Sequence, residues 1–143
     1  MSNGKVLLVD DNAEFLEILS ERIHNKGLDV ETATSGPEAL DKARDSSYDA
    51  IILDLVMPQM DGIETLKALR ERNPELQVIL MTGHGTVQKG VEAVKLGAMD
   101  FLEKPADIKE LMEKITEAKA KKALIVQKQH EERIKEILFT KGW

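Results

Sequence analysis

The sequence has no cysteine, and aromatic residues make up only 3% of its 143 positions. The absence of cysteine excludes disulfide bonds, thiolate metal sites and cysteine nucleophiles, and it agrees with a reducing compartment. Because aromatic residues are scarce, the core has to be built mainly from aliphatic side chains. Long hydrophobic runs are also missing, since no stretch approaches the roughly 20 apolar residues of a membrane span. We therefore expect a cytoplasmic protein that makes no membrane contact.

Positive charge is in deficit, and the formal net charge is -6 at pH 7. Proteins that bind nucleic acid are usually basic, so we expect no direct contact with nucleic acid. Hydrophobic residues make up 42% of the chain, which is enough for one core in a chain of single-domain length. The first apolar run, residues 6–9, is too short for the core of a signal peptide.

Short apolar runs alternate with segments of helical period along most of the chain. We expect strands at residues 5–10, 29–33, 48–55, 77–82 and 99–105, and helices at residues 13–27, 36–47, 61–73, 86–98 and 107–122. Alternation of this kind is typical of a parallel sheet with helices on both faces. The predicted fold class is therefore α/β, with a doubly wound five-stranded parallel sheet flanked by five helices.

The composition changes near the C-terminal end. We expect a main domain over residues 1–120, followed over residues 121–143 by a helical extension or linker. This segment is charged and favours helix, but its apolar residues are too clustered for a regular heptad seam. It is expected to extend the last helix or to form a second one that packs on the domain or on a partner. A solvated tail is the alternative, and the chain is either a stand-alone protein or part of a longer regulator.

Polar residues lie at the carboxyl ends of four of the five predicted strands, with Asp10 and Asp11 at the first, Asp54 at the third, Thr82 at the fourth and Lys104 at the fifth. In parallel α/β sheets the functional site lies beyond the carboxyl ends of the strands. Most of these residues also have structural explanations, such as capping a helix. Asp54 lies within the apolar run "AIILDLVM", where it has no helix to cap and where burial of an unpaired charge is costly.

Three carboxylates held close together repel one another, and a divalent cation relieves that repulsion. A ligand set made only of oxygen atoms favours a hard ion such as Mg²⁺. A carboxylate can also act as the nucleophile that accepts a phosphoryl group. A metal ion, an ammonium group and a hydroxyl stabilise the charge on a group in transfer. The residues at this edge therefore predict a phosphoryl-accepting aspartate.

The motifs "VLLVDDN", "IILDLVMPQMDG", "ILMTGHG" and "DFLEKP" occur in this order over about residues 4 to 120. In order and spacing, this set resembles the receiver domain of response regulators in bacterial two-component systems. The segment "TGHGTVQKGVEAVKLGAMDFLEKP" is similar to receivers of enhancer-dependent transcription activators. The resemblance implies the flavodoxin-like fold shared with chemotaxis regulators.

The resemblance also implies roles for single residues. Asp54 would accept a phosphoryl group from a sensor histidine kinase or a small phosphodonor, as a phosphoprotein in phosphorelay signal transduction. Mg²⁺ would be the cofactor, held by Asp10, Asp11, Asp54 and the backbone carbonyl of Val56. We expect a signalling switch and no turnover of a separate substrate. The alternative is a Mg²⁺-dependent phosphatase or phosphotransferase with an aspartate nucleophile, a class that typically shows an Asp-x-Asp pair after the first strand.

Four further roles follow from the resemblance. Thr82 and Lys104 would contact the phosphoryl oxygens, and Pro105 would follow a cis peptide bond that turns the lysine into the site. Thr82 and Phe101 would form the switch, in which Thr82 moves toward the phosphoryl group and Phe101 rotates into the space it leaves. The surface of the fourth helix, fifth strand and fifth helix would then change, and it would contact a downstream protein or a second copy of the chain.

Overall fold

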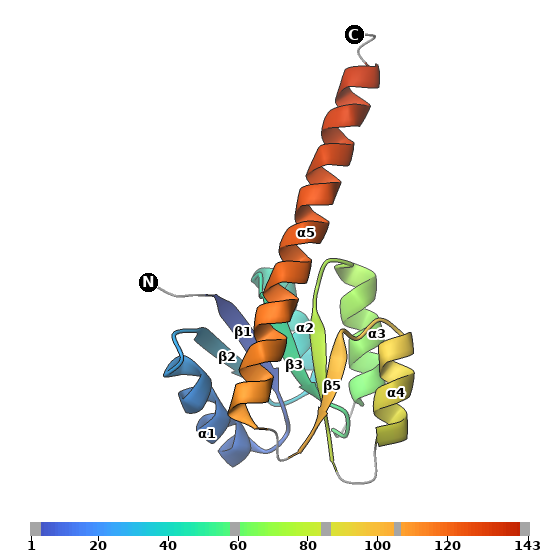
Figure 1. Ribbon diagram of the computed structural model, residues 1–143. Coiled ribbons are helices and arrows are strands. Elements are labelled where there is room, and N and C mark those ends of the chain that lie inside the picture. The colour runs from blue at the N-terminus through green and yellow to red at the C-terminus, as the bar shows by residue number, and fades with distance from the viewer. Residues whose placement is uncertain (1–3, 58–60, 84–86, 105–106, 141–143) are drawn as a thin grey trace.

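The computed structural model describes residues 4–57, 61–83, 87–104 and 107–140. Strands and helices alternate along the chain, as Figure 1 shows. The strands are β1 (Lys5–Val9), β2 (Asp29–Ala33), β3 (Ala50–Asp54), β4 (Val78–Thr82) and β5 (Asp100–Glu103). The helices are α1 (Ala13–His24), α2 (Gly36–Asp45), α3 (Gly62–Arg72), α4 (Val87–Lys95) and α5 (Ile108–Thr140). The predicted alternation is confirmed.

The five strands form one parallel sheet in the order β2-β1-β3-β4-β5. Val9 pairs with Leu53 across β1 and β3, so that Asp10 and Asp54 leave neighbouring strands side by side. Asp54 in turn pairs with Met81, the residue before Thr82. The predicted fold class is confirmed, and the register alone brings three of the expected site residues to one edge.

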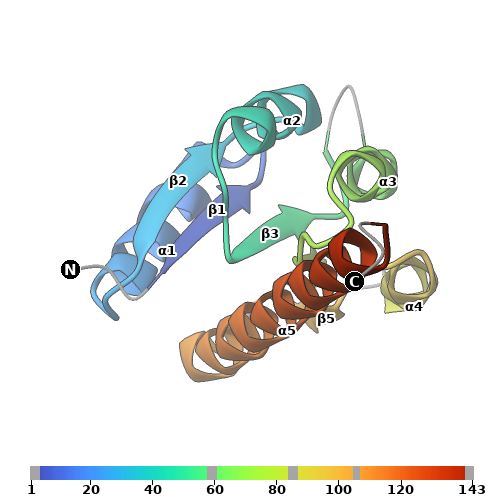
Figure 2. The same cartoon turned by 90° about the horizontal axis from the view of Figure 1, so that it is seen from above.

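Two apolar clusters cover the two faces of the sheet. Leu7 and Val9 point to one face, where they pack with residues of α2, α3 and α4. Val6 and Leu8 point to the other face, where they pack with residues of α1 and α5. This alternation is the two-residue period of a strand, and both faces are apolar because helices cover both. Seen from above in Figure 2, α2 and α3 lie on one side of the sheet and α1 and α5 on the other.

Several element boundaries differ from the prediction, and the earlier ends of β1, at Val9, and of β3 bear on the site. β3 ends at Asp54, one residue before the predicted end, so Asp54 is its last residue and not an interior one. Beyond it, the Val56 N–H turns back to donate to the Asp54 carboxylate, which ends the regular strand. α2 ends at Asp45, before the two serines that were predicted to belong to it.

The last helix, α5, is 33 residues long and continues without a break past residue 120. Its first half packs on the sheet through Leu111, Ile115 and Ala118. Its second half projects away from the domain in Figure 1, with largely exposed side chains. Of the arrangements predicted for the C-terminal segment, the extended last helix is therefore the one found as far as Thr140. Among the described residues, no helix is long and apolar enough to cross a membrane.

Candidate functional site

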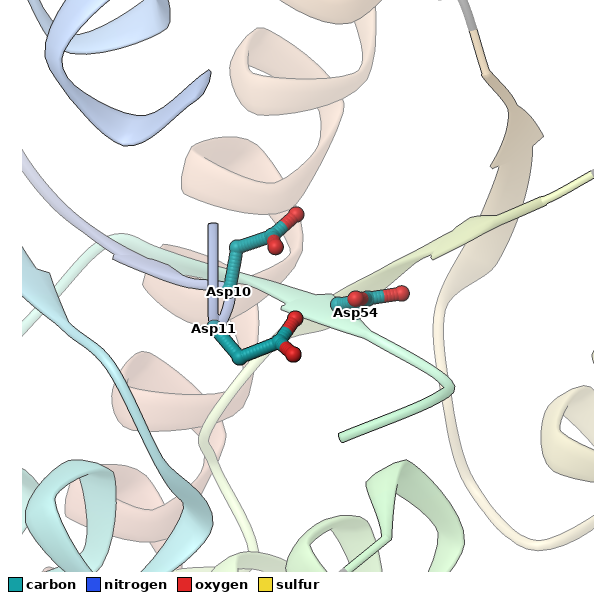
Figure 3. A group of neighbouring side chains, drawn as sticks. All are labelled: Asp10, Asp11 and Asp54. Carbon is teal, nitrogen blue, oxygen red and sulfur yellow. The ribbon is translucent and has the colours of Figure 1, made fainter. Parts of the chain in front are cut away.

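Three carboxylates meet where β1 and β3 end. Asp10 and Asp11 follow β1, and each offers an oxygen within 4.8 Å of an oxygen of Asp54 and of each other. Figure 3 shows the three side chains together at this edge of the sheet. Asp10 and Asp54 are nearly buried, at 3% and 7% exposure, whereas Asp11 is exposed. The sequence predicted this grouping, and the structure brings the three residues together.

Backbone N–H groups fix two of these carboxylates. The Asn12 N–H donates to Asp10 Oδ1 at 2.9 Å, and the Val56 N–H donates to Asp54 Oδ1 at 3.3 Å. The side chain of Asn12 accepts from the Phe15 N–H and caps α1. Because Asn12 makes the cap, capping does not explain Asp11. The loop that leads into α1 therefore holds the Asp10 carboxylate in place, and the loop after β3 holds that of Asp54.

The ammonium group of Lys104 reaches the acidic group from β5. Its Nζ lies 2.6 Å from Asp10 Oδ2 and 3.7 Å from Asp54 Oδ2. It also lies 4.5 Å from the centre of the Phe15 ring, within the range of a cation–π contact. The Lys104 N–H donates to the Thr82 carbonyl at 2.7 Å, which fixes the backbone at the root of this side chain. Lys104 thus lies where the sequence placed it, paired with the carboxylates.

Thr82 is fully buried at the end of β4, and its hydroxyl points to the neighbouring strand. Thr82 Oγ1 donates to the Leu102 carbonyl at 3.4 Å, a long hydrogen bond. Phe101, one residue earlier on β5, is half-buried and packs against the apolar cluster on the α4 side of the sheet. The two residues predicted to form the switch therefore lie on adjacent strands. Pro105 lies outside the described residues.

Burial and charge repulsion together determine the electrostatics of this edge. Burial raises the pKa of the Asp54 carboxyl, and the negative charge of Asp10 raises it further, while the Lys104 ammonium partly offsets both effects. Bringing a cation next to such a group relieves the repulsion. The clustered donor atoms are carboxylate oxygens, which are the ligands that hard divalent cations prefer. The residues present therefore fit Mg²⁺, with the Val56 loop beside them.

Two residues near the site were missed by sequence reasoning. Phe15 packs against the apolar cluster on the α1 side of the sheet, and its ring also faces the Lys104 ammonium. At Gly62, a Cβ would lie 2.6 Å from the Asp54 carbonyl oxygen and 2.6 Å from Leu55 Cα. The pair Asp61-Gly62 signals a helix start, whereas the close approach of α3 to β3 has no sequence signal of its own.

The fold and the site define a single α/β domain with a carboxylate-rich site at the carboxyl ends of its parallel strands. The model of the response regulator receiver domain family matches residues 6–116, which is most of the chain. The chain belongs to this family. It is thus a receiver domain of the two-component signalling class, and the predicted resemblance is confirmed.

Named relatives agree with this assignment. The transcriptional regulatory protein ZraR of Escherichia coli K12 is 38% identical over 118 residues, covering 82% of this chain and 27% of ZraR. The CpxR homolog of Haemophilus influenzae is 43% identical over 112 residues, covering 78% of this chain and 48% of that protein. A receiver domain protein from Clostridium thermocellum superposes with a TM-score of 0.81 at 31% identity, over 87% of this chain and 99% of that one. The chain thus spans about a quarter to a half of these two regulators.

Proposed function

We propose that Asp54 is the phosphoryl acceptor of this receiver domain and that a sensor histidine kinase or a small phosphodonor supplies the group. The proposal is supported by one observation above all. Asp54 is the last residue of β3, and it has a carboxylate oxygen within 4.8 Å of an oxygen of Asp10 and of Asp11. The Lys104 Nζ atom lies 3.7 Å from Asp54 Oδ2. In the transfer from a phosphohistidine, an Asp54 oxygen forms the new bond to phosphorus while the phosphorus–nitrogen bond breaks. The imidazole nitrogen keeps the electron pair and takes up a proton.

Mg²⁺ would be held by Asp10, Asp11, Asp54 and the backbone carbonyl of Val56. When bound, the ion supplies positive charge that stabilises the phosphoryl oxygens. It also relieves the repulsion that raises the pKa of Asp54. The loop after β3 presents Val56 two residues past the acceptor, and its N–H already holds the Asp54 carboxylate.

Lys104 and Thr82 would contact the phosphoryl group after leaving their present partners. The Lys104 ammonium, now 2.6 Å from Asp10, would pair with a phosphoryl oxygen. The Thr82 hydroxyl would give up its long bond to Leu102 and donate to another phosphoryl oxygen. A cis bond before Pro105 remains part of this proposal. The new bond of Thr82 is charge-assisted and therefore stronger than its present bond to a neutral carbonyl, whereas Lys104 exchanges one charge-assisted contact for another.

The output would be a changed protein–protein surface formed by α4, β5 and α5. On this surface α4 exposes Val91 and Val94, and the projecting half of α5 beyond it exposes Ile134, Ile137 and Leu138. Such residues suit a homodimer or a downstream protein partner. We place this signalling in the cytoplasm, without direct contact to nucleic acid or membrane and without turnover of a separate substrate.

Acetyl phosphate and Mg²⁺ provide a direct test. Incubation followed by intact mass measurement is expected to show one added phosphoryl group, and Asp54→Asn is expected to abolish it. Asp45→Asn, which changes an exposed carboxylate at the end of α2, is the matched control and is expected to remain fully competent. Addition to the Asp54→Asn variant would reject Asp54 as the acceptor. Continuous turnover of a phosphate ester would favour the enzyme class instead.

A further inference from the structure

We propose that Gly90 is a positioning residue for the switch. Because Gly90 has no Cβ, the Phe101 ring can pack directly over its Cα, and we call this contact the seat of the ring. The seat stabilises the resting arrangement of α4 and β5. The inference rests on the proposed function, since it concerns the state from which Asp54 is phosphorylated. It assigns to one glycine in α4 a share in setting how readily the domain switches.

The backbone at Gly90 does not account for the glycine. Gly90 is buried within α4, and the described glycines with positive φ are Gly4, Gly27 and Gly97. In a helix interior, glycine lowers the equilibrium constant for folding by about two- to fivefold relative to alanine. A buried helical glycine therefore calls for a reason in packing.

The Phe101 ring supplies that reason. A Cβ on Gly90 would lie 2.9 Å from Phe101 Cγ, 2.9 Å from Cδ2 and 3.3 Å from Cδ1. Since these three ring atoms are at similar distances, the missing methyl would sit over the face of the ring. Carbon atoms pack best at about 3.5–4.0 Å, so this approach is too close. Cγ is the root of the ring and cannot be moved aside by a small rotation. An alanine here requires the ring or α4 to move.

The seat is coupled to the site through β5. Phe101 directly precedes Leu102, whose carbonyl accepts the hydroxyl of Thr82. The ring position seen here thus accompanies a Thr82 hydroxyl that donates to β5. Alanine at position 90 destabilises this resting arrangement. By linkage, a ligand that binds the alternative arrangement more tightly then binds the variant more tightly than the unaltered protein.

A double-mutant cycle on urea unfolding tests the seat itself. Gly90→Ala is expected to destabilise the unaltered protein, because the methyl group meets the ring. In a Phe101→Ala background the same change is expected to stabilise, raising the folding equilibrium constant by about two- to fivefold through helix propensity alone. Equal stabilisation in both backgrounds would overturn the proposal, since it would show that the ring does not rest on Gly90.

Beryllofluoride, which mimics the phosphoryl group on an aspartate, tests the link to switching. We expect Gly90→Ala to lower the half-saturating beryllofluoride concentration, at fixed Mg²⁺, by about threefold or more. In the free protein, the amide resonances of Thr82 and Leu102 should shift toward their positions in the ligand-bound unaltered protein. Gln88→Ala, exposed on the same helix, is the control and should change neither quantity.

The two measurements separate the possible outcomes. Destabilisation by Gly90→Ala with an unchanged or higher half-saturating concentration would reduce Gly90 to a packing residue and overturn its role in the switch. Failure of the unaltered protein to bind beryllofluoride would instead count against Asp54 as acceptor, and the unfolding cycle would still decide whether Gly90 seats the ring. Because the beryllofluoride titration needs only the single variant, the test does not depend on Phe101→Ala folding.

Discussion

At the scale of single residues, the surroundings of Asp54 disfavour its charged form. Its pKa is raised, first by burial and then by Asp10, so the folded protein binds the proton more tightly than the unfolded chain does. Stability is therefore lost as the pH rises from the ordinary carboxyl value of 3.8 through the raised value. At neutral pH without metal, we expect Asp54→Asn to raise the free energy of unfolding by about 1 kcal/mol.

Urea unfolding as a function of pH checks this expectation. The gain of Asp54→Asn should vanish below the ordinary carboxyl value of 3.8, where the native carboxyl is also neutral. Added Mg²⁺ should stabilise the unaltered protein more than the variant, because binding to the folded state shifts the unfolding equilibrium. A variant that is less stable than the unaltered protein at neutral pH would contradict the repulsion argument.

Gly62 is the second residue at which the site constrains the chain. A methyl group there would meet the backbone of Asp54 and Leu55 at 2.6 Å, and backbone atoms cannot turn away as a side chain can. We expect Gly62→Ala to cost about 1–3 kcal/mol, the range for overpacking. Gly83→Ala is a matched control, since a methyl group there meets nothing within 4 Å. Equal stabilities of the two variants in urea unfolding would refute the close approach.

At the scale of elements, α5 is anchored near its middle. The Lys122 ammonium donates to Ser47 Oγ at 2.8 Å and to the Tyr48 carbonyl at 2.7 Å, at the end of the sheet opposite to the site. Lys122→Met keeps the apolar stem and removes these bonds. We expect a loss of about 1–2 kcal/mol in stability and faster hydrogen exchange in α5 beyond Ala118. Lys121→Met, at an exposed neighbouring position, should leave the exchange pattern unchanged.

At the scale of the whole molecule, the projecting half of α5 leaves apolar side chains in water. Ile134, Ile137 and Leu138 are spaced three and four residues apart and share one face of the helix, each about half exposed. If this face pairs with a second copy, Ile137→Lys should weaken self-association about tenfold or more in sedimentation equilibrium with beryllofluoride and Mg²⁺. Gln129→Lys adds the same charge at an exposed polar position and should have no such effect. A monomeric unaltered protein would reject the dimer.

Local patterns in the sequence were sufficient for the elements and for the membership of the site. Short apolar runs and segments of helical period are properties of neighbouring residues, so the five strands and helices were predictable. The carboxyl ends of parallel strands meet at one edge, so Asp10, Asp11, Asp54, Thr82 and Lys104 were predictable as one group. The order and spacing of the motifs also predicted the receiver domain family, and this resemblance implied that Thr82 and Phe101 form a switch.

The tertiary structure alone decided how these groups touch. The Lys104 ammonium lies against Asp10 and the Phe15 ring, a contact between residues far apart in sequence that no local period encodes. The close approaches at Gly62 and Gly90 depend on how α3 and α4 pack against neighbouring strands. A glycine in a sequence signals only freedom of the backbone. Whether it marks a turn or a seat for another side chain depends on the atoms that packing brings beside it.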